Sequence, residues 1–186
     1  MPLPKFRSLF LGLVAGLVLG LGHVPGADAA SIDKFIPAPE AMPAPEVVFA
    51  DADGRERRLS DFRGKVLVVN FWATWCAPCV KEMPALDALS QRLPAEDFAV
   101  LAISIDRGGI AVTRPFLEKL GVAHLGLYVD PAGRAPAAFK AAGLPTTIII
   151  DAEGKVRGRL LGAADWASPE AEALVRGHRT AAPAKG

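Results

Sequence analysis

The chain has 186 residues, a length typical of one domain with a short appendage, and its 51% of hydrophobic residues are enough for a packed core and exclude a disordered protein. Charged residues make up 22%, the net charge is +1 and no charge block occurs, so nothing indicates nucleic-acid binding. The only two cysteines, Cys76 and Cys79, are too few for a disulfide-stapled scaffold or a four-cysteine zinc site.

Residues 1–30 read as a targeting segment rather than as part of the fold. Lys5 and Arg7 precede an apolar run at residues 9–21, and residues 27–29 (Ala-Asp-Ala) offer the small side chains that signal peptidase reads. The run of 13 residues is shorter than the about 20 that span a membrane, but the uncharged stretch extends beyond it. A cleaved signal peptide and an uncleaved membrane anchor are therefore both open. Either one exports the domain, and membrane contact is expected only through this segment.

Residues 31–45 predict an extended linker, because the stretch is too rich in proline for a helix. The folded domain is expected over residues 46–178, followed by a flexible tail at residues 179–186. The domain begins with a β-hairpin, in which strands at residues 47–50 and 56–59 flank a turn of sequence Asp-Ala-Asp-Gly.

The rest of the domain alternates apolar strands with helices. Further strands are expected at residues 65–71, 98–105, 125–129, 146–150 and 156–161. Helices are expected at residues 77–93, 113–120, 131–142 and 168–176. Thr113 is expected to cap the second of these helices and Ser168 the last. This alternation predicts an α/β fold with a mixed sheet, whose last two strands pair antiparallel about a tight turn.

Both cysteines lie where a buried strand ends and a helix begins. The strand delivers Cys76 to the edge of the sheet, where we expect it to be exposed, and the helix N-terminus directs N–H groups and a partial positive charge at its sulfur. Cysteines in such settings have pKa values lowered to about 3.5–7.5, and the thiolate is the attacking form in disulfide exchange. Cys79 lies one helical turn further on, less exposed and close enough to form a disulfide. Pro78 suits the first helical turn, and Trp75 is expected to shield the site.

Other uses of two thiols remain open at this point. Two thiolates can hold copper(I), so a copper carrier is an alternative. The same dithiol could also serve a thiol oxidase or isomerase. The histidines, His23, His124 and His178, are scattered, so we expect no metal site. The expected redox group is the Cys76–Cys79 disulfide itself, with no further cofactor.

The active-site stretch resembles a known family. Residues 68–84 (VVNFWATWCAPCVKEMP) look like the active site of thioredoxin-like proteins, and more narrowly of the exported TlpA/ResA thiol–disulfide reductases. Residues 143–151 (GLPTTIIID) resemble the second hallmark of that fold. Residues 162–166 (GAADW) look like the segment before the last helix of TlpA, which favours the TlpA branch. Over residues 46–178 the resemblance implies a thioredoxin-like fold, a central mixed β-sheet flanked by helices, with an N-terminal β-hairpin extension.

The resemblance places the family's cis-proline at Pro145. A cis bond there would bring the backbone of Leu144 beside the Cys76 sulfur, so that a partner's cysteine segment could add as an extended strand. Without the resemblance, an ordinary trans proline at the start of a strand would be expected. The residues expected to contact the substrate are Trp75, Pro78, Leu144, Pro145 and Thr146.

Glu82 is the expected proton carrier. Cytoplasmic thioredoxins have a buried Asp where this chain has Asn70, whereas the exported reductases resemble this chain in having a Glu three residues after the second cysteine. A partly buried carboxylate has a raised pKa and can exchange a proton with the inner thiol. The alternative is a solvated Glu paired with a basic neighbour, but no residue three or four positions away along the helix is basic.

The resemblance implies an extracytoplasmic thiol–disulfide oxidoreductase that reduces disulfides in partner proteins. Reduced Cys76 would attack the client disulfide, and Cys79, deprotonated with help from Glu82, would resolve the mixed disulfide. The resemblance also implies a membrane protein as thiol-reducing electron donor, and clients in cytochrome c maturation or in copper delivery to cytochrome oxidase. A peroxidase of the same fold would need its cysteine in a different setting from this tight CxxC spacing.

Overall fold

The computed structural model describes residues 31–179, and the expectations for residues 1–30 and 180–186 lie outside them. The strands are β1 (Ile36–Pro43), β2 (Val48–Asp51), β3 (Glu56–Arg58), β4 (Val66–Trp72), β5 (Phe98–Ser104), β6 (Gly126–Val129), β7 (Thr146–Ile150) and β8 (Lys155–Leu161). The helices are α1 (Ala77–Arg92), α2 (Ile110–Lys119), α3 (Arg134–Ala138) and α4 (Pro169–Arg176), with short 3₁₀ helices at Ile32–Lys34 and Leu59–Phe62. Within residues 31–179, no helix is long and apolar enough to cross a lipid bilayer.

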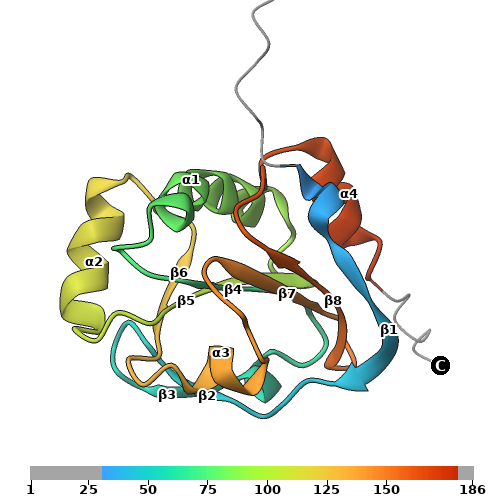
Figure 1. Cartoon of the computed structure of the whole chain (residues 1–186), viewed down its shortest axis with the longest axis horizontal. Coiled ribbons are helices and arrows are strands. Elements are labelled where there is room, and N and C mark those ends of the chain that lie inside the picture. The colour runs from blue at the N-terminus through green and yellow to red at the C-terminus, as the bar shows by residue number, and fades with distance from the viewer. Residues whose placement is uncertain (1–30, 180–186) are drawn as a thin grey trace, which may run out of the picture.

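The strands form one mixed sheet in the order β1-β8-β7-β4-β5-β6-β2-β3 (Figure 1). The central strand β4 runs parallel to β5 and antiparallel to β7, and all seven of its residues are buried, as its continuous apolar run predicts. The expected hairpins are present, because β2 pairs antiparallel with β3 and β7 with β8. The expected mixed α/β sheet with an N-terminal hairpin is therefore confirmed.

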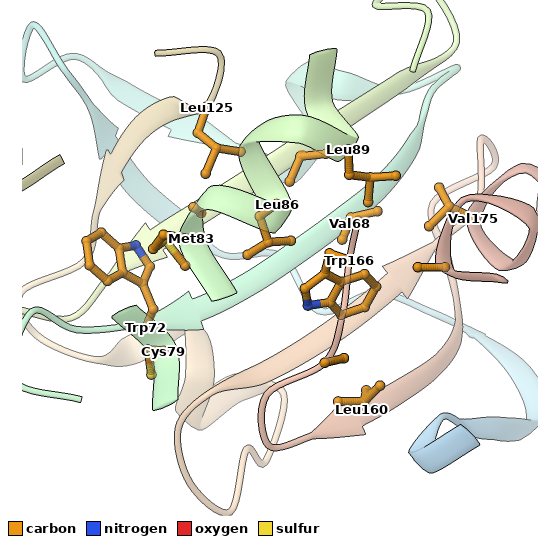
Figure 2. Packing of buried hydrophobic residues seen from close by; sticks show 14 of the residues in the cluster. Val68, Trp72, Cys79, Met83, Leu86, Leu89, Leu125, Leu160, Trp166 and Val175 are labelled. Atoms are coloured by element: carbon orange, nitrogen blue, oxygen red, sulfur yellow. The ribbon is translucent and has the colours of Figure 1, made fainter. Parts of the chain in front are cut away.

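Helices cover both faces of the sheet, with α1 and α4 on one face and α3 on the other (Figure 1). Met83, Leu86 and Leu89 recur at helical spacing along α1 and are fully buried against the sheet. Trp166 precedes α4 and packs into the same cluster, where Figure 2 shows its indole near Leu86 and Val68. Burying each of these large side chains stabilises the fold by about 1.5–3 kcal/mol, so α1 and the segment around Trp166 are held firmly on this face.

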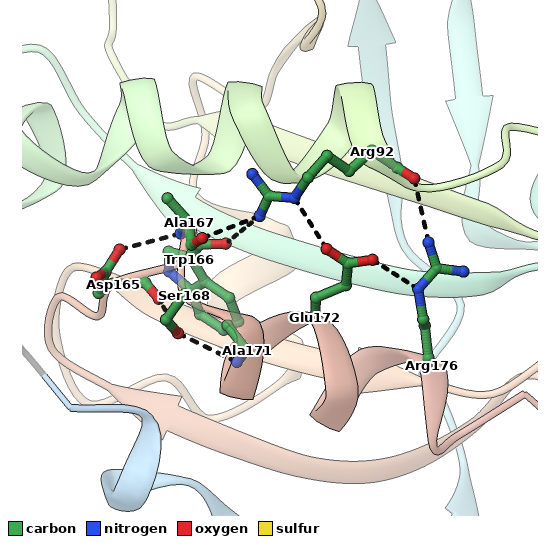
Figure 3. Close-up of polar contacts among 8 residues, drawn as sticks. All are labelled: Arg92, Asp165, Trp166, Ala167, Ser168, Ala171, Glu172 and Arg176. Carbon is green, nitrogen blue, oxygen red and sulfur yellow. Dashed lines mark hydrogen bonds and ion pairs between the residues drawn. The ribbon is translucent and has the colours of Figure 1, made fainter.

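A polar cluster fastens the start of α4 to the end of α1 (Figure 3). Arg92, in the last turn of α1, donates from Nε to Glu172 (2.9 Å) and from a terminal nitrogen to the carbonyl of Ala167 (3.2 Å). The other carboxylate oxygen of Glu172 accepts a hydrogen bond from Arg176 (2.8 Å). Ser168 caps α4 as expected, since its hydroxyl accepts the N–H three residues on. These contacts fix the position of the residues just before α4.

The expected bounds of two helices need correction. Helix α2 begins three residues before Thr113, and its N-cap is Gly109, whose φ of 56° favours glycine. Thr113 is fully buried inside the helix and donates to the carbonyl of Gly109 (2.8 Å) instead of capping. Helix α3 is shorter than predicted, because its N-cap Gly133 and the nearby Lys140 both have positive φ and bound it.

The expected linker at residues 31–45 is the main error of the sequence-based fold. Residues 36–43 form the edge strand β1, which pairs antiparallel with β8, so the domain begins before residue 46. Prolines are tolerated at an edge because one side of such a strand makes no ladder hydrogen bonds. A Cβ atom at Gly158 would lie 2.6 Å from the carbonyl oxygen of Ile36 and closer still to the ring of Phe35. The close approach of β1 to β8 therefore depends on glycine at position 158. At the other end, Arg179 of the expected flexible tail forms an ion pair with Asp97 (3.0 Å).

We therefore expect Gly158→Val to release β1 from β8, because the new side chain would occupy the space of Phe35 and the Ile36 carbonyl. Amide hydrogen exchange should quicken over residues 36–43 and stay slow in β4 and β7. Lys155→Val, at an exposed position of the same strand, is the matched control and should leave exchange unchanged. Full protection of residues 36–43 in Gly158→Val would contradict this account of the edge.

Candidate active site

The two cysteines lie at the start of α1, directly after the loop that leaves β4, and form a disulfide. Cys76 is the N-cap of the helix, and its sulfur accepts the backbone N–H of Cys79 at an N···S distance of 3.4 Å. Cys79 is fully buried and Cys76 is 6% exposed. Cys79 is therefore the less exposed of the two, as expected, but Cys76 is not exposed as expected. The disulfide and the hydrogen bond from the Cys79 N–H hold the Cys76 sulfur at the first turn of α1.

An open cleft borders the site on the side of Trp75. Its volume is about 610 Å³, and its walls are Trp75, Ile105, Asp106, Arg107 and residues 131–133. The Trp75 side chain is 69% exposed, so most of its ring faces solvent. The buried carboxylate of Asp106 accepts hydrogen bonds from the backbone N–H (2.9 Å) and the hydroxyl (2.7 Å) of Thr74, which fixes the loop that presents Trp75. That Trp75 shields the disulfide stays a prediction.

The peptide bond between Leu144 and Pro145 is cis, as the resemblance implied. Strand β7 begins at the next residue, Thr146, which pairs with Phe71 near the end of β4. Pro145 therefore lies at the same edge of the sheet as the loop that carries Cys76. Within residues 31–179, neither the N–H nor the carbonyl of Leu144 makes a hydrogen bond, so both are available to a partner backbone. Pro78 is exposed in the first turn of α1 at the same end of the molecule.

Glu82 is buried on the inner face of α1, with an exposed fraction of 3%. One carboxylate oxygen accepts a hydrogen bond from the side-chain amide of Asn70 (2.8 Å). The other accepts from the backbone N–H of Ala164 (3.1 Å) and from the indole N–H of Trp166 (3.1 Å). All three partners are neutral donors, so the alternative of a solvated Glu paired with a basic residue is wrong.

Burial raises the pKa of Glu82 to about 7, because the charged form loses its hydration. The hydrogen bonds from Ala164, Asn70 and Trp166 act in the opposite direction and favour the charged form. A carboxyl with a pKa near 7 can both accept and release a proton at neutral pH. Cys79 lies one helical turn earlier and is buried with Glu82 on the same face of α1.

Sequence reasoning found Glu82 but not the groups that hold it. Trp166 was noted only as the end of the segment at residues 162–166, whereas its indole donates to the carboxylate. A buried tryptophan needs a partner for its N–H, and this was the available signal. Asn70 was recognised only as the replacement of an Asp. The contact of the Ala164 N–H could not be predicted, because a backbone donor has no signal in the sequence. Within residues 31–179, no group of three or more His, Cys, Asp or Glu side chains could hold a metal ion.

Comparisons with known proteins agree with this geometry. The model of the AhpC/TSA family matches residues 41–159. Thiol-disulfide oxidoreductase ResA of Geobacillus thermodenitrificans is 36% identical over 119 residues, which are 64% of this chain and 67% of that protein. The relative carries the ResA name, and the preference for the TlpA branch drawn from residues 162–166 stays a prediction.

Solved structures show the same fold. A putative thiol:disulfide interchange protein DsbE from Chlorobium tepidum superposes with a TM-score of 0.63 at 27% identity, covering 75% of this chain and 94% of that one. The exposed lipoprotein thioredoxin Etrx1 from Streptococcus pneumoniae has a TM-score of 0.61 at 25% identity, covering 72% and 99%. The expected thioredoxin-like fold is confirmed.

The buried carboxyl should make stability depend on pH. The pKa of Glu82 is about 7 in the folded protein and 4.5 in the unfolded reference, so between these values the folded state binds more protons. The free energy of unfolding should therefore fall as the pH rises from about 5 to about 8, by about 3 kcal/mol at about 1.36 kcal/mol per pKa unit. Urea denaturation of the oxidised protein across this range measures the slope.

Glu82→Gln, which cannot ionise, should remove the contribution of Glu82 to this pH dependence. Glu118→Gln, at an exposed position of α2, is the matched control and should keep the slope of the wild type. Parallel stability curves for the wild type and Glu82→Gln would show that Glu82 does not titrate in this range.

Proposed function

We propose that this chain, a thiol–disulfide oxidoreductase that belongs to the AhpC/TSA family, reduces disulfides in partner proteins outside the cytoplasm. The observation that carries the proposal is the Cys76–Cys79 disulfide with Glu82 one helical turn away, a buried carboxyl whose partners within residues 31–179 are all neutral. This arrangement supplies an attacking sulfur, a resolving sulfur and a group that can take the proton of the resolving thiol.

The cysteines have different roles because α1 places them differently. Cys76 caps the helix, where N–H groups and the helix dipole stabilise a thiolate, and it is the more exposed of the two. Cys79 is fully buried one turn further on, where desolvation disfavours its thiolate. Cys76 is therefore the attacking cysteine, and Cys79 needs a base before it can react.

The reaction begins with the reduced enzyme. The Cys76 thiolate attacks one sulfur of a client disulfide, and the other client sulfur leaves as a thiolate and takes a proton from water. The Cys79 thiol then passes its proton to the Glu82 carboxylate, and the Cys79 thiolate attacks the Cys76 sulfur of the mixed disulfide. The second client thiolate leaves and is protonated in turn. Two electrons have moved from the enzyme dithiol to the client, and the enzyme is left with the Cys76–Cys79 disulfide.

The client is held at the edge of the sheet beside Pro145. The unpaired N–H and carbonyl of Leu144 support the addition of a client segment as an extended strand, with main-chain hydrogen bonds supplying affinity. Pro78 is exposed at the same end of the molecule, and Trp75 offers an exposed aromatic surface with the cleft behind it. Thr146, which was expected to contact the substrate, is instead buried and donates its hydroxyl to the carbonyl of Gly143. Backbone recognition of this kind accepts clients of varied sequence around their cysteines.

The proposed location rests on residues 1–30, whose basic start and apolar run are typical of a signal peptide or membrane anchor. The structural relative Etrx1 is described as an exposed lipoprotein. Because exported compartments oxidise thiols, the enzyme would need a membrane thiol-reducing donor to return it to the dithiol form. The resemblance to exported reductases favours clients in cytochrome c maturation or in assembly of the oxidase copper site.

Mixed disulfides provide the direct test of this function. Cys79→Ser in the full chain should accumulate Cys76-linked adducts with client proteins, because the resolving thiol is missing. After acid quenching and alkylation, non-reducing electrophoresis and mass spectrometry identify the partners. Cys76→Ser is the matched control, and its single buried Cys79 should form few adducts.

Two outcomes would contradict the proposal. Absence of adducts together with tight copper(I) binding by the Cys76/Cys79 pair would indicate a copper carrier. Oxidation of client thiols by the disulfide form, faster than reduction of client disulfides by the dithiol form, would indicate an oxidase or isomerase. Recovery of cytochrome apoproteins or of oxidase copper-site proteins would separate the two client pathways.

A further inference from the structure

Asn70 lies on β4 beside the Glu82 carboxyl of α1, and the oxygen of its side-chain amide has no hydrogen-bond partner within residues 31–179. Its side-chain nitrogen Nδ2 donates to Glu82 Oε1 (2.8 Å) and to Thr147 Oγ1 (2.9 Å). Its side-chain oxygen Oδ1 is buried and makes no hydrogen bond with any residue from 31 to 179. Unpaired buried polar atoms are uncommon in folded proteins, so this one needs a reason.

The partners of Glu82 suit only its charged form. A carboxylate accepts hydrogen bonds and donates none, and all three of its partners are N–H donors. Once protonated, the carboxyl must donate one hydrogen bond. The backbone N–H of Ala164 and the indole N–H of Trp166 cannot accept it. Among these hydrogen-bond partners, only the side chain of Asn70 also carries an acceptor, its Oδ1.

We propose that the side-chain amide of Asn70 rotates by half a turn about its Cβ–Cγ bond when Glu82 gains a proton, so that Oδ1 and Nδ2 exchange places. Asn70 is then a positioning residue for the proton that Glu82 exchanges. In the charged state, Nδ2 donates to Glu82 and to Thr147, as in the structure. In the protonated state, Oδ1 takes the place of Nδ2 and accepts the O–H of Glu82 and the O–H of Thr147. The purpose assigned to this proton, transfer from Cys79, rests on the proposed function.

Thr147 makes both orientations of the amide possible. A hydroxyl can accept a hydrogen bond from Nδ2 in one state and donate to Oδ1 in the other, by rotation of its hydrogen alone. The nitrogen and oxygen of an amide occupy equivalent positions, so the hydrogen-bonding heavy atoms keep their places in both states. The carboxyl can thus titrate with its own hydrogen bonds satisfied and without displacement of α1 from the sheet. The place without a partner then holds Nδ2 instead of Oδ1.

Among the residues that the structure describes, no charged side chain bonds to the Glu82 carboxyl. The groups around the Glu82 carboxyl are the Asn70 amide from β4, with Thr147 of β7 behind it, the Ala164 N–H and Trp166 indole from the segment before α4, and Cys79 one turn back on α1. Asp165, between the two donors of that segment, accepts instead from the N–H of Ala167 (3.1 Å). Burial and hydrogen bonds alone set the pKa of Glu82, with no charged group among its causes.

The sequence makes the test unusually clean, because Asn70 is the only asparagine in the chain. Selective labelling of asparagine with ¹⁵N gives a single side-chain amide signal, which is followed in the oxidised wild-type protein from about pH 5 to about pH 9. At high pH the amide protons should show a strong NOE to the Thr147 methyl group. At low pH this NOE should weaken and the amide protons should shift upfield. Both changes should have the same midpoint pH as the titration of the Glu82 carboxyl ¹³C signal.

An amide whose NOE pattern stays constant while the Glu82 carboxyl titrates would overturn the proposal, and so would a carboxyl that does not titrate between about pH 5 and about pH 9. Glu82→Gln should make the amide signal independent of pH, whereas Glu118→Gln should behave as the wild type. Reorientation that persists in Glu82→Gln would show that another group drives it and would also overturn the proposal.

This experiment is independent of the proposed function, because it uses the oxidised protein without a client. A constant amide signal in a protein that still traps clients through Cys76 would overturn only the inference about Asn70. Amide reorientation in a protein that forms no mixed disulfides would instead overturn the proposed function and leave the inference about Asn70 standing.

Discussion

A carboxyl buried without a cation, that of Glu82, is the constraint on which the rest of the site depends. Its charged form loses hydration inside the protein, and the N–H donors of Asn70, Ala164 and Trp166 offset part of that loss. Two of these donors come from the segment before α4, which the Arg92–Glu172 contact fastens to the end of α1. The packing of α4 on α1 therefore helps to hold two of the three donors at the carboxyl.

The same geometry divides the chemistry between the two cysteines. Helix α1 carries Cys76 at its N-terminus, where backbone N–H groups stabilise a thiolate, and carries Cys79 and Glu82 on its buried face. The inner thiol is protected from solvent and reacts only when a base removes its proton. In the proposed mechanism a buried carboxyl with a pKa near 7 is that base at neutral pH, and its neutral partners allow it to change charge without breaking an ion pair.

The sequence was most informative where structure is local. The apolar run of β4 predicted the central strand, the two cysteines one turn apart where a helix begins predicted the disulfide, and the resemblance around Pro145 predicted the cis peptide bond. Contacts between distant segments were missed. Strand β1 depends on the absent side chain of Gly158, while its prolines suggested a linker, and the donors of Ala164 and Trp166 reach Glu82 only through tertiary packing. Periodicity describes one element at a time and says little about which elements meet.

The central claim is that Glu82 takes the proton of Cys79 when the mixed disulfide resolves. The most direct test is the single-turnover rate of this step, measured across pH after mixing reduced protein with a disulfide substrate. The account predicts a wild-type rate that rises to a plateau above about pH 7, where burial places the pKa of Glu82, and a slower rate in Glu82→Gln whose rise is displaced to higher pH. Identical rates and pH profiles in the two proteins would contradict it.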